Sequence, residues 1–198
     1  MTYTLDFTIL PGDEAFESRS IFIGPSNDLR NRLVSMPHTL ERIESAIMFA
    51  AQSLKQSEPW RAAAFLRAAL ADFCSVEEMQ KLDRGNKSHF TIRSSANPLL
   101  HVLELMRHMN IHVKSVKVQT HKIGITLGGV EHEMETFIVS NLNHHDLGSL
   151  WNSKHYSTSD LESCVAWFES RQMEWGAGDL VCLGTTILAT QVCDHFNL

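Results

Sequence analysis

Two hydrophobic periods divide the chain into a short β-like start and a long helical body. The odd-numbered residues from Tyr3 to Ile9 are apolar and alternate with polar residues, which is the period of a half-buried strand. A second apolar stretch at residues 21–23 ends at Gly24-Pro25, a pair that breaks regular structure. Together they predict a small N-terminal β attachment within residues 1–36.

Residues 39–112 show the period of helices and predict a helical core, because apolar positions recur there every three or four residues. A new helix is predicted at Ser57-Glu58-Pro59, where a hydroxyl can cap the helix and proline fits its first turn. The polar residues 83–97 predict an exposed loop with at most a short strand at 90–92.

The next helix is predicted to open at Asn97-Pro98 and to end before His112, because strand-like residues follow. Residues 113–139 then alternate around a Gly128-Gly129 turn, which predicts an antiparallel β-ribbon. A polar connection leads to a pair of C-terminal helices over 158–196, with a capping box at Ser159 and Glu162. The fold class is therefore mainly α: one domain over residues 1–198, a helical bundle with a small ribbon.

Composition narrows the classes of function. The chain has 198 residues with 17 basic and 23 acidic side chains, a net charge of −6, which excludes a broad basic coat for nucleic acid but leaves room for a local basic site. The four cysteines form no CxxC pair, and three of them lie in apolar helical surroundings and are predicted to be small buried hydrophobes. Trp167, Phe168 and Trp175 are likewise predicted to belong to the core rather than to a surface that stacks bases.

We expect no contact with membranes and a cytoplasmic location. The first residues lack the basic region of a secretory signal, and the longest apolar stretch, residues 180–193, is shorter than the ~20 residues that a bilayer span needs.

Histidine is the main source of candidate chemistry. No glycine-rich phosphate loop, HExxH or GxSxG motif occurs, but the chain has 11 histidines. His101, Glu104, His108 and His112 are spaced so that they share one helix face if the helix extends that far. Such a set can bind zinc or iron, which would suit a metal-dependent hydrolase, or it can be an ordinary solvated face. We favour the solvated face and expect neither metal nor cofactor.

The segment Arg107-His108-Met109-Asn110-Ile111-His112 has a second interpretation. It resembles the signature of the HEPN family of helical RNA-cleaving and RNA-binding domains, in which an arginine and a polar residue precede a histidine. A second match of the same spacing, Arg84 to His89, lies in a predicted loop and lacks the polar neighbour. The resemblance covers roughly residues 39–112, where the motif follows two long helices and stands at the end of a third.

The resemblance implies a metal-independent endoribonuclease that acts as a homodimer, with both Arg107–His112 pairs lining a shared cleft. Enzymes of this sort belong to bacterial defence, toxin or stress systems. RNA can be cut without metal when its own 2′-hydroxyl attacks the neighbouring phosphate. An imidazole, whose ordinary pKa is about 6.5, can move the protons, and an arginine can hold the charged oxygens.

The predicted roles follow from this chemistry. His112 is the acid or base, Arg107 binds the phosphate, and His108 orients it or shares the proton transfer. His101 and Asn110 are assigned to substrate binding. A structural role, with Arg107 capping its helix and His112 packing under the ribbon, is an equal alternative. The second choice for the function is an inactive HEPN-like module that binds a protein partner, such as an antitoxin or a nucleotidyltransferase-like protein.

Overall fold

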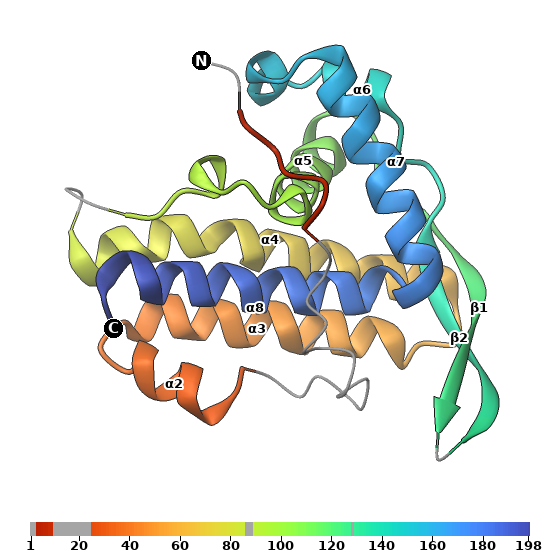
Figure 1. Cartoon of the computed structure of the whole chain (residues 1–198), viewed down its shortest axis with the longest axis horizontal. Coiled ribbons are helices and arrows are strands. Elements are labelled where there is room, and N and C mark those ends of the chain that lie inside the picture. Colours follow the sequence, from red (N-terminus) through yellow and green to blue (C-terminus); the bar gives the residue numbers. More distant parts are fainter. Residues whose placement is uncertain (1–2, 10–24, 86–88, 128) are drawn as a thin grey trace.

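Three long helices form the base of the molecule. The computed structural model describes residues 3–9, 25–85, 89–127 and 129–198. Helix α3 (Pro37–Leu54) packs against both α4 (Pro59–Arg84) and α8 (Ala177–Phe196), and the three run side by side (Figure 1). Proline occupies the first turn of α3 and of α4, where its missing N–H costs no hydrogen bond. The apolar faces between these helices are dry and include Ile43, Ile47, Leu66, Leu70 and Phe73.

Helix α5 (Pro98–His112) lies across this base and is the most enclosed element. Asn97 caps it by accepting a hydrogen bond from the backbone N–H of Leu99, as Asn97-Pro98 predicted. Every residue from Pro98 to Met106 is buried, because α4, α7 and α8 all pack against the helix. Only its last residues, from Arg107 to His112 apart from the buried Met109, reach the surface.

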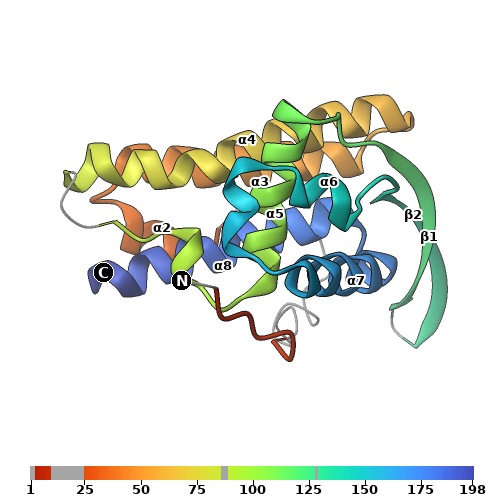
Figure 2. The same cartoon turned by 90° about the horizontal axis from the view of Figure 1, so that it is seen from above.

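Two short elements flank α5, and a β-ribbon follows it. A 3-10 turn, η1 (Ile92–Ser94), precedes it in the chain; α6 (His144–Gly148) and a second 3-10 turn, η2 (Trp151–His155), pack near it on another side (Figure 2). The ribbon pairs β1 (Val118–Leu127) antiparallel with β2 (Val130–Val139), Val118 lying opposite Val139.

The ribbon projects from the bundle and is anchored at its base. Phe137, Ile138 and Val139 are buried, whereas residues 130–135 are exposed. The side-chain amide of Gln172, on α7 (Thr158–Trp175), donates to the carbonyl of Val139 and accepts from its N–H, at 2.9 and 2.8 Å. This pair of bonds satisfies the backbone where the ribbon enters the core.

The N-terminal prediction was wrong in the described part. Residues 3–9 form no strand; instead the N–H of Asp6 donates to the carbonyl of Ala96, and the Tyr3 ring packs on His101 and Tyr156. The apolar stretch at 21–23 lies outside the described residues. Within the predicted attachment the chain forms a helix, α2 (Asn27–Leu33), capped by Ser26. The alternation therefore reflects the partial burial of Tyr3, Leu5 and Phe7 against the bundle.

The mainly helical fold with a small antiparallel ribbon is confirmed. Several boundaries differ from prediction. Helix α5 extends to His112, the short strand at 90–92 is replaced by η1, and α6 and η2 occupy the predicted polar connection. The capping box of α7 uses Ser157 and Asp160. Helix α4 begins after Glu58, with no side-chain cap.

The structure also bears on the predictions about cysteines, aromatic residues and membrane-spanning helices. Cys164, Cys182 and Cys193 are buried and free, and the buried Trp167, Phe168 and Trp175 belong to the core. Among the described helices, none is by itself long and apolar enough to cross a membrane, although α7 and α8 pass that test together across a bend of 110°.

A substitution at Gly176, between α7 and α8, can test how tightly the base of the ribbon is packed. Its φ is 84°, and an added Cβ would lie 2.1 Å from Thr136 Oγ1; Gly85 has a similar φ of 80° with open space around it. Strained backbone of this kind costs about 1–3 kcal/mol in a non-glycine residue, and overpacking adds about 1–3 kcal/mol. In urea unfolding, Gly176→Ala should therefore destabilise the protein by clearly more than Gly85→Ala. Equal losses would contradict the close approach of Thr136.

Candidate functional site

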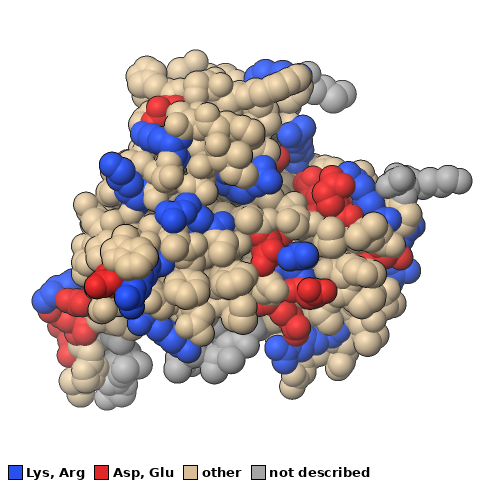
Figure 3. All heavy atoms as spheres, turned by 180° about the vertical axis from the view of Figure 1, so that it is seen from behind, with Lys and Arg blue, Asp and Glu red and all other residues tan. Residues whose placement is uncertain are grey.

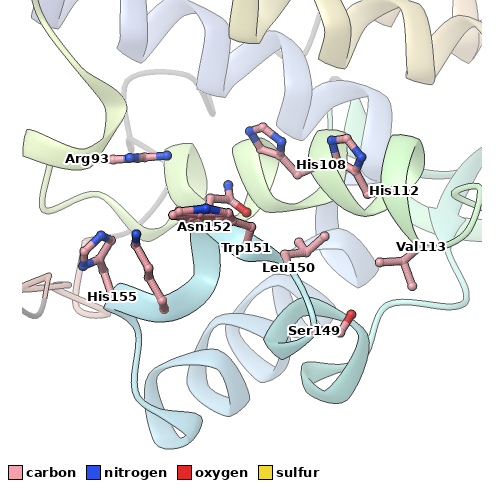
Figure 4. A pocket seen from close by; sticks show the side chains of 10 residues that line it. Arg93, His108, His112, Val113, Ser149, Leu150, Trp151, Asn152 and His155 are labelled. Atoms are coloured by element: carbon pink, nitrogen blue, oxygen red, sulfur yellow. The ribbon is translucent and has the colours of Figure 1, made fainter.

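The end of α5 forms one wall of a pocket of about 1010 Å³, which we call the η2 pocket. Arg93 of η1 and His108 and His112 of α5 lie along one side (Figure 4). Trp151, Asn152 and His155 of η2 lie along the other side (Figure 4). The remaining lining residues are Val113, Ser149, Leu150 and Lys154. The pocket thus gathers three imidazoles, an arginine, a lysine and an exposed indole.

The helix end explains how two of the histidines come together. Because α5 stays helical to His112, His108 and His112 lie one turn apart on one face. Their rings are nearly parallel, with 12° between the planes and 6.1 Å between the centroids. Directly afterwards the side chain of Asn110 accepts a hydrogen bond from the N–H of Val116, which turns the chain toward the ribbon. Asn110 therefore holds the backbone and does not line the pocket.

His108 is held in its neutral form. Burial, together with the charge of Arg107, lowers the pKa of His108 to about 4. The Nη1 atom of Arg107 lies 3.4 Å from Nδ1 of His108. A guanidinium can only donate, so Nδ1 accepts this bond and the ring proton lies on Nε2. At neutral pH His108 is accordingly an uncharged hydrogen-bond donor.

Glu104 lies behind the pocket and connects its walls. It is almost fully buried, and its Oε1 atom is 3.5 Å from Nη2 of Arg93 and 3.9 Å from Nε2 of His108. Its carboxyl group also accepts a hydrogen bond from the side chain of Asn152. Burial raises the pKa of Glu104, although Arg93 opposes this. One carboxyl group thereby positions residues from η1, α5 and η2.

Arg107 faces a different, smaller pocket of about 260 Å³ that also borders on Cys74 and Glu77. Arg93 and His108 contribute to both pockets, but His112 does not line the smaller one. Five positions on an α-helix correspond to about 140° of rotation, so Arg107 and His112 point in different directions. The structure brings His108 and His112 together and places Arg107 on the far side of His108.

His101 is part of the core. It is fully buried, with Nδ1 2.6 Å from the hydroxyl of Tyr156 and Nε2 2.8 Å from the carbonyl of Ser95. A carbonyl only accepts, so Nε2 donates to Ser95 and the hydroxyl of Tyr156 donates to Nδ1. Burial lowers the pKa of His101. Its two nitrogens are occupied, and it does not reach the η2 pocket.

The predicted face of His101, Glu104 and His108 does not form a metal site. In the part of the chain that the structure describes, no three His, Cys, Asp or Glu side chains are placed to hold a metal ion. The helix does extend to His112, as this face required, but its first half is enclosed in the core.

Four residues of the pocket were not predicted from the sequence: Arg93, Trp151, Lys154 and His155. Arg93 lies in a segment predicted to be an exposed loop, and the other three lie in the predicted polar connection. The sequence did contain a hint of this site. The run Trp151-Asn152-Ser153-Lys154-His155 combines an aromatic ring, a cation and an imidazole in a segment that is otherwise typical of a solvent-exposed loop.

No known protein family, curated protein or solved structure matches the chain. The function is therefore inferred from the chemistry of the η2 pocket and from the residues around it.

The neutral state of His108 can be tested by its titration. We expect the imidazole signals of His108 to titrate near pH 4 in NMR spectra, and Arg107→Gln to move this pKa upward, because a neighbouring positive charge is removed. Arg30→Gln, which breaks an exposed pair with Glu44, should leave it unchanged. Because the pKa of His108 is lower in the folded protein than the ordinary 6.5, the unfolded chain binds a proton more readily. The folded state should therefore lose stability as the pH falls from about 6.5 toward 4. An unshifted His108 signal would contradict its burial.

Proposed function

We propose that the protein is a metal-independent endoribonuclease that binds an RNA phosphate in the η2 pocket. The observation that carries this proposal is the pairing of His108 and His112 opposite Lys154, with Arg93 alongside. No carboxylate belongs to the lining of this pocket in the described residues. Two fixed cations and a hydrogen-bonding imidazole favour an anionic ligand, and a second imidazole can move protons on it.

The proposed reaction uses the nucleophile that RNA itself supplies. The 2′-oxygen attacks the adjacent phosphorus while His112 accepts the hydroxyl proton. A bond forms between the 2′-oxygen and phosphorus, and the bond from phosphorus to the 5′-oxygen breaks. The leaving 5′-oxygen takes up a proton from a protonated imidazole or from water. The products are a 2′,3′-cyclic phosphate and a 5′-hydroxyl.

The other residues stabilise the charge that develops on the phosphorane. Arg93 and Lys154 offset it, and the Nε2 proton of His108 is available to a non-bridging oxygen. Arg107 acts through His108, whose neutral form it supports. This differs from the role that the HEPN resemblance implies for Arg107, because the cations that line the pocket with His112 are Arg93 and Lys154.

The homodimer is part of the same proposal. Ile111 and Val113, on either side of His112, are exposed large apolar side chains, and Val113 lines the pocket. A second copy placed there would cover them and exclude water from the pocket. Light scattering of the purified protein measures this state directly.

An RNA-cleavage assay in EDTA tests the activity. We expect cleavage that survives EDTA and gives 2′,3′-cyclic phosphate ends detectable by mass spectrometry. His112→Ala should lower the rate by about 10²–10⁴-fold, the usual contribution of general acid–base catalysis. Lys154→Ala should lower kcat as well as raise KM, because it removes a charge that binds the phosphate and also stabilises the phosphorane. His132→Ala, which removes an exposed histidine on β2, is the matched control and should retain full activity.

Two results would overturn the proposal. One is the absence of cleavage by the unmodified protein with any RNA; binding without cleavage would then indicate the inactive module. The other is full activity of His112→Ala.

A further inference from the structure

We infer that Trp151 is a stacking platform for an unpaired base, so that the ligand of the η2 pocket is single-stranded nucleic acid. This inference rests on the proposed function for the location of the phosphate. Trp151 is 66% exposed and lines the pocket together with Arg93 and Lys154. By contrast, Trp167 and Trp175 are almost completely buried.

The backbone beneath Trp151 is rigidly held. Leu150, directly before it, is buried in the core. The hydroxyl of Ser153 donates to the carbonyls of Gly148 and Leu150, at 3.0 and 2.6 Å. The indole is therefore presented from a fixed turn, and little conformational entropy is lost when a flat ligand lies on it.

A positively charged group lies next to the Trp151 ring. The ammonium group of Lys154 lies 3.5 Å from the centroid of the Trp151 ring, over one face. Because Trp151 stays two-thirds exposed with that face occupied, ring surface remains open to a ligand. A flat apolar surface next to a positive charge matches one nucleotide unit, whose base has a π-face and whose phosphate is anionic.

Other residues of the pocket can bind the phosphate of the nucleotide whose base lies on Trp151. Arg93 and His108 lie across from Trp151 (Figure 4). A base on Trp151 would thus be flanked by donors for its backbone. Only an unpaired base can use such a platform, because the faces of a base in a duplex are covered by its neighbours. The arrangement selects single strands without reading a sequence.

The chain contains a matched control. Trp60 is 65% exposed and also has a cation over its ring, with the guanidinium carbon of Arg61 5.2 Å from the ring centroid. It lies in the first turn of α4 and is not part of the pocket lining. Trp60 and Trp151 thus differ mainly in whether a phosphate site lies beside them.

The test measures binding of a fluorescently labelled single-stranded DNA oligonucleotide, which cannot be cleaved because it lacks the 2′-hydroxyl. We expect Trp151→Ala to weaken binding by about tenfold to a hundredfold, as stacking on an aromatic side chain typically contributes. Trp151→Phe should restore most of the affinity, and Trp60→Ala should bind like the unmodified protein. The same oligonucleotide as a duplex should bind more weakly and respond little to Trp151→Ala.

The results separate this inference from the proposed activity. Trp151-dependent binding of the DNA strand supports the platform even if RNA is not cleaved, in which case only the ribonuclease proposal fails. Unchanged single-strand binding by Trp151→Ala overturns the platform, even if RNA is cleaved. So does an equal loss for the duplex, or a change in oligomeric state with Trp151→Ala, which would assign Trp151 to a protein interface.

Discussion

The burial of polar side chains on α5 is the constraint on which the site depends. The first half of this helix is enclosed by α4, α7 and α8, so His101 and Glu104 must find partners within the protein. A buried polar group without one costs about 1–3 kcal/mol. His101 bonds to Ser95 on one side and to Tyr156 on the other, and Glu104 contacts Arg93 and Asn152. The same bonds that satisfy the helix therefore hold η1 and η2 beside its end.

This constraint reconciles a cationic pocket with an acidic chain. The net charge is −6, yet Glu104 lies behind the lining of the pocket, where its carboxyl group is 3.5 Å from the guanidinium of Arg93. Other acidic side chains are concentrated elsewhere, including Glu131, Glu133 and Glu135 along the exposed half of β2. Viewed from behind, acidic groups lie at the edge where the ribbon is and also on the opposite half of the molecule, and mostly basic groups lie between them (Figure 3). If the proposed function holds, such a local cationic site engages few phosphates, and the binding of RNA should depend only weakly on salt.

The helices and strands that are determined by residues close together in the chain could be predicted from the sequence. Helical periodicity, Asn97-Pro98 and the alternation of residues 113–139 predict the long helices and the ribbon, and these helices and the ribbon are present; Gly128 of the predicted turn lies outside the described residues. The apolar alternation of residues 3–9 wrongly predicted a strand, because a segment that packs on a bundle can partly bury every second residue without a partner strand. The end of α5 was misjudged for a related reason: the residues after it favour strands, but buried Met109 and the cap at Val113 keep the last turn helical.

The pocket could not be predicted, because it depends on residues far apart in the chain. Nothing near His112 in sequence indicates Arg93 or Lys154, which reach it only through the packing of η1 and η2 on α5. The Arg107–His112 spacing lies at the helix end that borders the pocket, but the structure places His112 beside His108 there and Arg107 beside another pocket. A separation of five positions turns the two side chains about 140° apart on a helix. Arg107 can then influence His112 chemistry in one chain only through His108, which it contacts and which stacks on His112. A direct role for Arg107 at the same phosphate as His112 would require a second copy of the chain facing the first across that helix end.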